Sequence, residues 1–489
     1  MMKHPKLLII IFCLFSCILS FGQNTFQRTY GFKGYNYGKC AYQTDDGGYI
    51  ILGDISGYGG NTDIYLVKTD TLGKIEWDKA IGDTEIYWAN DFKITHDKGY
   101  IIAGYTDKNA GNGYDVLLIK TDSSGNVKWE KTYGGTDWDL GYSVIEDKHH
   151  NYLIAGETFS YSFGGGDVYV IKTDSMGDTI WTKHYGGTGN DIAYSIDTTL
   201  SSNYIVSGVT QGLTDSTYDA YLLKINSNGD TIFTKAFSDS LDNKFFCARQ
   251  IDSSGYVVCG SVKNLLGSHQ LIIKTDTLGN RIWMRVFINP KSEELYDIKK
   301  SWDNDLVATG YTTSSGAGGE DITITLYTSD GWFITGNNFG GLNNDVSYSV
   351  NLTSDSGYIC TGTTESFGLG ISNIYFVKTK KPFPAFTSPP TQETGIVEIN
   401  PSQGFSFSAF PNPTTGLLKV NINNAENEQI DLKVINILGI ELISDSFKPA
   451  KSLCYKTINL SGFPDGVYIV QVSGNKYSTG FKVIKQTSR

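Results

Sequence analysis

Oxygen-bearing side chains recur at one position of the sequence, at intervals of roughly 52 residues. Six of the seven occupants are acidic or amide residues, and the seven are Asn36, Tyr87, Asp139, Asp191, Asn243, Glu293 and Asp345. Calcium prefers carboxylate and amide oxygens, and the candidate calcium ligands are Asp139, Asp191, Glu293 and Asp345. The alternative is that each side chain caps a turn by accepting hydrogen bonds from local backbone N–H groups. Recurrence in nearly every unit favours capping, because one ion does not need seven equal ligands.

A second series of carboxylates follows the same spacing and opens a predicted strand in most units. Its members are Asp63, Asp115, Asp167, Asp219 and Asp321, continued by Asn373. We expect turn capping here as well, for the same reason.

Aromatic residues that break the repeat are the candidates for ligand binding. Trp88 and Trp138 lie in predicted loops, and Tyr87, Tyr161 and Phe163 lie in or beside the longer loops. Aromatic rings beside Asp and Asn are typical of sugar-binding surfaces, where a ring stacks on a pyranose and carboxylates bind its hydroxyls. The alternative is that these rings fold back over the protein's own strands.

The sequence contains no recognisable catalytic motif. Its six histidines form no HExxH, and neither GxSxG nor a nucleotide-binding loop occurs in a suitable context. We expect the adjacent His149 and His150, on a predicted tight turn, to be solvated. A carboxylate pair for glycoside hydrolysis stays open, because the separation of two side chains cannot be read from a sequence. These observations favour a protein that is not an enzyme.

An internal repeat positions all of these residues. A lysine near the end of one strand-like run recurs as Lys68, Lys120, Lys172, Lys224, Lys274 and Lys378, with Leu326 in the corresponding place. Seven units follow, and each carries four strand signals bounded by turn residues. Four strands per repeat of this length predict an all-β fold, a seven-bladed β-propeller over residues 24–380.

The two ends of the repeat array complement each other. The seventh unit lacks its fourth strand, whereas Phe26–Gly31 near the N-terminus matches Trp129–Gly134, a fourth strand. We therefore expect the N-terminal strand to complete the last blade and close the ring. The longer loops of a propeller share one face of the disc, which is the default binding face.

Targeting and linker segments flank the propeller. Lys3 and Lys6 precede an apolar run at Leu7–Leu19, so residues 1–22 are predicted to be a secretory signal peptide. The run is too short for a comfortable membrane span. Five prolines within twenty residues mark a linker at 381–405. The formal net charge of −11 argues against nucleic acid as a partner.

Beyond the linker the repeat ends, and short alternating strands over residues 406–489 predict a small β-sandwich. This region resembles the C-terminal sorting domains, type A, of bacterial type IX secretion. The residues that carry the resemblance are Pro411, Asn412, Pro413, Gly416, Gly439, Gly466 and Tyr468. The resemblance implies the type IX secretion machinery as a partner, export across the outer membrane, and a cell-surface or extracellular location. It commonly implies removal of the domain and attachment of the rest to surface lipopolysaccharide.

Together these features predict a secreted, surface-anchored binding or adhesion protein whose ligand is a glycan or a protein. Calcium is the one cofactor that the repeated carboxylates suggest. Two alternatives stay open, a secreted hydrolase of extracellular polymer that uses carboxylates at the mouth of the central channel, and a passive scaffold. Fold alone cannot separate them, because propellers host many functions.

Overall fold

The computed structural model describes most of the chain. The described residues are 25–56, 61–108, 113–212, 217–237, 241–381, 383, 389–393, 406–410, 414–423, 429–436, 440–449, 453–473 and 478–485. The predicted signal peptide and most of the predicted linker lie outside them. Every regular element in the described ranges is a β-strand. Among the described residues, no helix has the length and apolarity needed to cross a lipid bilayer.

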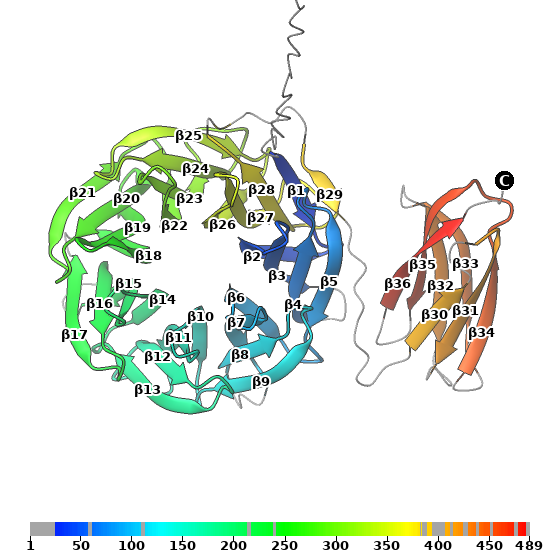
Figure 1. Ribbon diagram of the computed structural model, residues 1–489, viewed down its shortest axis with the longest axis horizontal. Helices are drawn as coiled ribbons and strands as arrows, with labels where there is room; N and C mark the ends of the chain where they lie inside the picture. The colour runs from blue at the N-terminus through cyan, green and yellow to red at the C-terminus, as the bar shows by residue number, and fades with distance from the viewer. Residues whose placement is uncertain are drawn as a thin grey trace, which may run out of the picture.

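Seven antiparallel sheets surround one axis and form a β-propeller (Figure 1). Blade 1 comprises β2 (Tyr35–Gln43), β3 (Tyr49–Ser56), β4 (Thr62–Thr69) and β5 (Ile75–Ile81). Blade 2 comprises β6 (Tyr87–Ile94), β7 (Tyr100–Thr106), β8 (Asp115–Thr121) and β9 (Val127–Tyr133). Blade 3 comprises β10 (Asp139–Glu146), β11 (Tyr152–Thr158), β12 (Asp167–Thr173) and β13 (Thr179–Tyr185). Blade 4 comprises β14 (Asp191–Thr198), β15 (Tyr204–Gln211), β16 (Tyr218–Ile225) and β17 (Thr231–Phe237).

The remaining blades follow the same pattern. Blade 5 comprises β18 (Asp242–Asp252), β19 (Gly255–Asn264), β20 (Gly267–Thr275) and β21 (Arg281–Phe287). Blade 6 comprises β22 (Glu293–Lys300), β23 (Leu306–Thr312), β24 (Asp321–Tyr327) and β25 (Phe333–Phe339). Blade 7 comprises β26 (Asp345–Leu352), β27 (Tyr358–Thr364) and β28 (Asn373–Thr379), joined by β1 (Phe26–Tyr30) and β29 (Thr391–Glu393). The seven-bladed propeller predicted from the repeat is confirmed.

The core lies between neighbouring blades. The two middle strands of each blade are buried along almost their whole length, as in β11 and β12, because both faces of each sheet pack against another sheet. Outer strands such as β9 are partly exposed. The recurring fourth-strand tryptophan contributes to this packing, since Trp129 of blade 2 contacts Tyr152 of blade 3 with ring centroids 6.0 Å apart.

The N-terminal strand closes the ring. β1 pairs antiparallel with β28, and the short β29 from the linker adds a parallel strand on its outer side. Tyr30 of β1 is fully buried, and its hydroxyl donates a hydrogen bond of 2.8 Å to the carbonyl of Gly73 in blade 1. The first and last blades are thus joined by backbone pairing and by side-chain packing.

The recurring lysine has a structural role. In five of the six blades that carry this lysine, its ammonium lies beneath the turn between the first two strands of its own blade and pairs with an aspartate there. The pairs are Lys68–Asp46 at 2.8 Å, Lys120–Asp97 at 2.8 Å, Lys172–Asp147 at 3.1 Å, Lys274–Asp252 at 3.3 Å and Lys378–Asp355 at 2.8 Å. These ion pairs tie together the short turns on one face of the disc.

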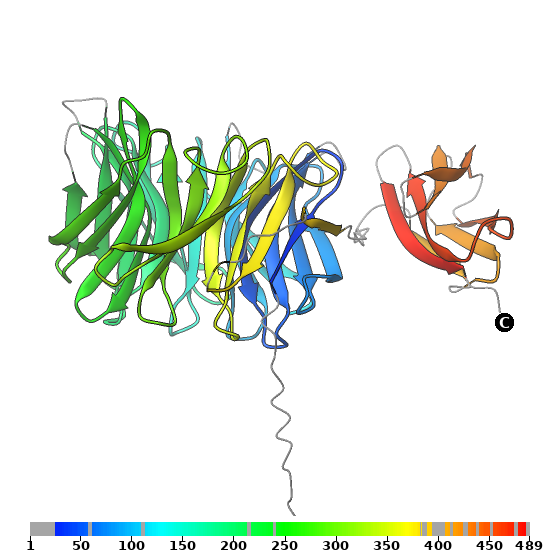
Figure 2. The ribbon, with the colours of Figure 1, turned by 90° about the horizontal axis from the view of Figure 1, so that it is seen from above.

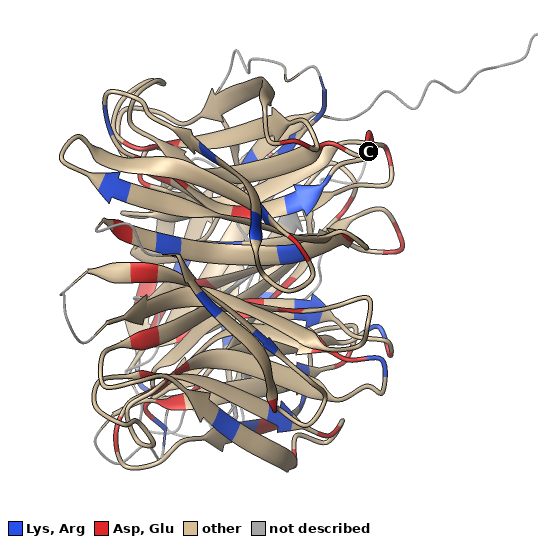
Figure 3. Cartoon of the chain, turned by 90° about the vertical axis from the view of Figure 1, so that its left-hand side faces the viewer, with Lys and Arg blue, Asp and Glu red and all other residues tan. Residues whose placement is uncertain are grey.

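The strands run between two faces of the disc (Figure 2), and the two faces differ in loop chemistry. The two longer loop classes contact each other on one face: the Phe159 amide donates to the Trp138 carbonyl at 2.8 Å, and the Asp191 amide donates to the Gly166 carbonyl at 2.7 Å. Charged residues recur instead in the short turns of the opposite face (Figure 3). We call these the long-loop face and the short-turn face.

The C-terminal region forms two small antiparallel sheets. The first has the order β30 (Ser406–Phe410), β31 (Leu417–Asn423), β34 (Leu453–Asn459). The second has the order β33 (Glu441–Phe447), β32 (Ile430–Asn436), β35 (Gly466–Ser473), β36 (Ser478–Lys485). Buried residues of both sheets, including Leu418, Val420, Leu432 and Val470, form one hydrophobic core. The region is therefore the small β-sandwich that the strand pattern predicts.

Candidate functional site

The first carboxylate series caps turns. The Asp139 carboxylate is buried and accepts hydrogen bonds from the Gly135 amide at 2.9 Å and the Ser160 hydroxyl at 2.6 Å. Corresponding bonds reach Asp191 from Gly187 N at 2.9 Å, Glu293 from Thr312 Oγ1 at 2.6 Å, and Asp345 from Gly341 N at 2.8 Å. Among the described residues, no three of these four side chains bring their carboxylate oxygens within 4.8 Å of one another. Each of the four candidate calcium ligands therefore has hydrogen-bond partners of its own, as the capping alternative predicts, and calcium binding by these residues stays a prediction.

The second carboxylate series lies against the first at the junctions between blades. A Cβ atom on Gly186 would lie 2.3 Å from Asp167 Oδ1 and 2.5 Å from Asp191 Oδ2, so only glycine fits between them. Asp115 and Asp139 flank Gly134 in the same way. Burial, and then the charge of Asp139, raise the pKa of Asp115. These carboxylate pairs belong to the packing between blades and not to a ring around the axis.

Aromatic side chains surround the axis instead. Each inner strand has a β-bulge at the same place, such as Tyr142 between Gly141 and Ser143, and a bulge re-aims the extra side chain. The bulge residue is aromatic in blades 3 to 7. Successive ring centroids lie 6.0 Å apart for Tyr142–Tyr194, 5.3 Å for Tyr194–Phe246, 4.7 Å for Phe246–Tyr296 and 5.4 Å for Tyr296–Tyr348. We call these five residues the axial ring cluster.

A second aromatic series leads from the axis to the long-loop face. Its ring centroids lie 5.6 Å apart for Tyr37–Trp88, 6.3 Å for Trp88–Tyr105, 5.3 Å for Tyr105–Tyr114 and 5.2 Å for Tyr114–Trp138. All five side chains are partly exposed, Trp138 to 47%. We call these five residues the aromatic band. It unites Trp88 and Trp138, although Trp88 lies in the inner strand β6 and not in the loop expected from the sequence.

The other three predicted aromatic residues lie outside the aromatic band. Tyr87 is only 1% exposed, and its hydroxyl lies 2.7 Å from Lys108 Nζ. It is therefore a core residue and not a surface for a ligand. Tyr161 folds back, since its hydroxyl donates to the Gly134 carbonyl at 2.7 Å. Phe163 is 68% exposed, and among the described aromatic rings it contacts His184, at 4.9 Å.

Two buried carboxyls lie next to these aromatic groups. Asp54 accepts a hydrogen bond from the Ala89 amide at 2.8 Å and pairs with Lys39 at 3.3 Å, while Lys39 lies 5.5 Å from the Trp88 ring. Burial raises the pKa of Asp54 to about 6. Burial, and then the charge of Asp191, raise the pKa of Glu157 to about 7.

The raised pKa of Glu157 predicts a specific pH dependence of stability. The folded chain holds this proton up to about pH 7, whereas an unfolded glutamate loses it near pH 4.3, so the free energy of unfolding falls as the pH rises between these values. Because Glu157→Gln cannot ionise, we expect it to exceed the wild type in stability by about 2 kcal/mol at pH 8. Urea denaturation at pH 5, 6.5 and 8 would measure the gap, and a gap that does not widen with pH would contradict this assignment.

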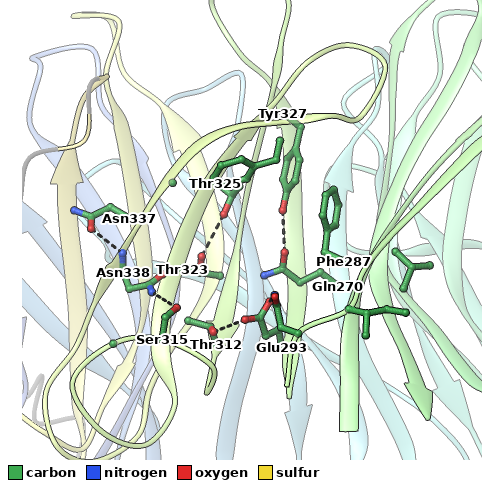
Figure 4. A pocket seen from close by; sticks show the side chains of 16 residues that line it. Gln270, Phe287, Glu293, Thr312, Ser315, Thr323, Thr325, Tyr327, Asn337 and Asn338 are labelled. Carbon is green, nitrogen blue, oxygen red and sulfur yellow. Dashed lines mark hydrogen bonds between the residues drawn. The ribbon is translucent and has the colours of Figure 1, made fainter. Parts of the chain in front are cut away.

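A polar cavity of about 810 Å³ separates blades 5 and 6 (Figure 4). Its wall contains Thr323, where other blades carry Tyr or Leu, and Thr325, where other blades carry Val, Ile or Leu. Gln270 of the facing blade replaces an apolar Ile, Val or Ala, and its Oε1 accepts a hydrogen bond of 2.9 Å from the Tyr327 hydroxyl. The smaller side chains of Thr323 and Thr325 leave the space open, and together with Gln270 they make its wall polar.

Sequence reasoning missed both the axial ring cluster and this cavity, although each leaves a signal. The axial ring cluster is a recurring aromatic residue three positions after the capping residue. The cavity corresponds to polar residues at positions that are otherwise apolar in the repeat, namely Gln270, Thr323 and Thr325. Comparing corresponding positions across all seven units would have found both.

The structure describes only part of the predicted sorting motif. Pro411, Asn412, Pro413 and Gly439 lie outside the described residues. Gly416 has a φ of 146° and lies so close to Ser461 that a Cβ atom would be 2.4 Å from its Oγ. Tyr468 is buried in the sandwich, with its hydroxyl donating to the Pro464 carbonyl, and Gly466 opens β35.

Residues 408–486 match the family model described as the secretion system C-terminal sorting domain. The C-terminal domain is a type IX secretion sorting domain. The chain is therefore a type IX secretion cargo, exported across the outer membrane to the cell surface or the extracellular space. The resemblance stated from the motif residues is confirmed.

Solved structures with a similar arrangement share little sequence with this cargo protein. A GH32 β-fructofuranosidase from Bombyx mori is 10% identical, covering 71% of this chain and 86% of its own, with a TM-score of 0.30. An acylaminoacyl peptidase from Pyrococcus horikoshii is 12% identical, covering 80% and 58%, with a TM-score of 0.40. Sqt1 from Chaetomium thermophilum is 10% identical, covering 81% and 96%, with a TM-score of 0.39. Sequence identities and TM-scores this low say nothing about the activity of this chain. No curated protein matches the chain in sequence.

Proposed function

We propose that the exported protein is a non-catalytic binding or adhesion protein whose aromatic band engages a glycan. The observation that carries this proposal is the continuity of the aromatic band. The band runs from blade 1 through blade 2 to the loop before blade 3, and each ring contacts the next one along it. All of its members are partly exposed, namely Tyr37, Trp88, Tyr105, Tyr114 and Trp138. Rings of this kind present apolar faces on which a pyranose can stack.

The surroundings of the aromatic band favour an uncharged polar ligand. The long-loop face carries few charged residues compared with the short turns. Asp54 and Lys39 largely satisfy each other beside Trp88, at 3.3 Å. The net charge of −11 disfavours polyanions. A neutral glycan therefore fits better than a nucleic acid, and a protein ligand is the principal alternative.

Glycan-array binding by the mature full-length protein tests the proposal. We expect selective binding, and we expect Trp88→Ala and Trp138→Ala each to weaken it about tenfold or more, as truncation of a central aromatic contact does. Phe163→Ala is the matched control, because Phe163 is an exposed ring of the long-loop face outside the aromatic band, and it should leave binding unchanged. Binding should also be independent of calcium, since the repeated carboxylates cap turns.

Other outcomes have definite meanings. Absence of binding to any glycan would overturn the glycan assignment and favour a protein ligand or a passive scaffold. Equal loss in all three variants would show that the aromatic band has no special role.

One observation favours a second candidate, a secreted hydrolase of extracellular polymer. A carboxyl with a pKa near 7, as Glu157 has, suits a general acid. Release of reducing ends from an array-positive glycan, abolished in Glu157→Gln but with binding retained, would establish this activity in place of simple binding.

A further inference from the structure

Two histidines and a glutamate meet on the short-turn face, between blades 2 and 3. His96 Nδ1 lies 2.5 Å from Glu146 Oε1, and His150 Nδ1 lies 3.3 Å from the same oxygen. The two imidazole rings stack with centroids 3.5 Å apart and an angle of 27°. Within the described ranges, this is the one group of three or more His, Cys, Asp or Glu side chains whose ligand atoms all lie within 4.8 Å of one another.

Rigid elements hold the three side chains. Glu146 is the last residue of β10 and is only 12% exposed, and its Oε2 accepts a hydrogen bond of 2.8 Å from the His96 amide. His96 lies in the β6–β7 turn of blade 2, which the Thr95 amide closes by donating to the Gly99 carbonyl at 2.9 Å. His150 lies in the β10–β11 turn of blade 3, where its amide donates to the Asp147 carbonyl at 2.9 Å. The backbone positions of the three residues are therefore held by hydrogen bonds that do not depend on an ion.

We propose that His96, Glu146 and His150 bind a divalent transition-metal ion of the zinc class. Two imidazole nitrogens and one carboxylate oxygen form a common zinc ligand set, with bonds near 2.0–2.2 Å. Imidazole suits zinc, copper and nickel, whereas calcium and magnesium prefer oxygen ligands alone. Two ligand atoms bound to one tetrahedral zinc ion lie about 3.4 Å apart. The His150–Glu146 distance of 3.3 Å already matches this spacing, and the shorter His96–Glu146 contact of 2.5 Å would open when the ion binds.

The geometry also indicates what kind of site this is. Both histidine side chains are about half exposed, so the remaining coordination positions of the ion open to solvent. Three protein ligands with open positions differ from a closed structural site, which uses four. Because the ligands come from adjacent blades, the ion would bridge blades 2 and 3 while presenting free coordination positions on the short-turn face.

His149 and His150 are both exposed, as expected for a tight turn, and the structure separates their roles. His150 turns toward Glu146, whereas His149, one residue earlier in the same turn, is not part of the group. The chain thus offers its own control, a neighbouring histidine of the same turn outside the cluster.

Calorimetric titration of tag-free, EDTA-treated mature protein with ZnCl₂ tests the proposal. We expect one zinc ion per chain, with affinity lowered at least tenfold in His96→Ala and in His150→Ala, since even outer-shell changes cost 10–100-fold. His149→Ala should stay within about twofold of the wild type, given that it removes no ligand. A parallel titration with CaCl₂ should show no binding at this site. Copper-loaded protein should show two imidazole nitrogens in its EPR hyperfine pattern.

Melting temperatures in EDTA distinguish loss of the site from loss of the fold. Because the histidines are half exposed, we expect both variants to have the melting temperature of the wild type when metal is removed. They should lose only the rise in melting temperature that zinc produces. The proposal would be overturned if the wild type bound no zinc, or if neither His96→Ala nor His150→Ala weakened zinc binding. It would also be overturned if His149→Ala weakened zinc binding as much as these two substitutions do.

Discussion

Tyr30→Ala is expected to lower the free energy of unfolding by about 4 kcal/mol, the range found when a large buried aromatic side chain is truncated. Tyr30 is fully buried between blades 7 and 1, and its hydroxyl bonds to the Gly73 carbonyl. The contacts that this substitution removes are those by which β1 closes the ring, so β1 should also become more accessible to proteolysis. Urea denaturation would measure stability, and limited proteolysis would measure local opening.

Two controls separate closure from ordinary packing. Tyr30→Phe keeps the ring and removes only a hydrogen bond, so it should cost about 1–2 kcal/mol. Tyr133 makes the same contact, from its hydroxyl to Gly177 O at 2.6 Å, between two blades that are joined by the chain. If Tyr133→Ala exposes its own strand to proteolysis as readily as Tyr30→Ala exposes β1, closure by β1 has no special importance.

Asp355→Ala should be the second strongly destabilising change, costing about 3 kcal/mol or more. Lys378 is 1% exposed, and both oxygens of Asp355 lie within 2.9 Å of its ammonium. Removing the carboxylate leaves a buried charge with no partner of opposite sign, the costly way to break such a pair. Chemical denaturation at pH 7 would measure the loss.

The natural variation between blades supplies the control. Blade 6 has Leu326 in place of the lysine, so an apolar side chain fits this position. Lys378→Leu should therefore cost much less than Asp355→Ala, because the partly exposed Asp355 keeps its hydrogen bonds from Thr353 and Gly357. Equal costs would show that the buried charge is not the cause.

Acid should weaken the same pair. Burial acts to raise the pKa of Asp355, but hydrogen bonds from Lys378 and Thr353 outweigh it and hold that pKa below its ordinary value. A depressed carboxyl pKa stabilises the fold above the unfolded value of about 3.9 and loses this effect as the pH falls below it. The stability difference between wild type and Lys378→Leu should accordingly shrink in acid.

The two proposed binding regions lie on opposite faces of the disc. The aromatic band reaches the long-loop face, whereas His96, Glu146 and His150 lie on the short-turn face. Substitutions in one region should therefore leave binding at the other unchanged. This independence allows a glycan or protein ligand and a metal ion to be tested in the same preparation.

The blade number, the four-strand unit and the sorting domain could all be predicted from the sequence. Periodicity and motif spacing are properties of consecutive residues, so each repeat could be recognised without knowing its neighbours. The match of Phe26–Gly31 to a fourth strand likewise pointed to the pairing of β1 with β28. Turn capping by Asp139 was also foreseeable, because its partner Gly135 lies only four residues away.

The contacts between side chains of different blades could not be predicted from the sequence and became visible in the folded structure. Trp88 and Trp138 are fifty residues apart, and among the described rings Tyr105 and Tyr114 link them. His96 and His150 occupy different positions of their turns, so the repeat does not align them. The β-bulges that re-aim the axial ring cluster and the packing distance between blades determine these contacts, and neither follows from the spacing of residues along the chain.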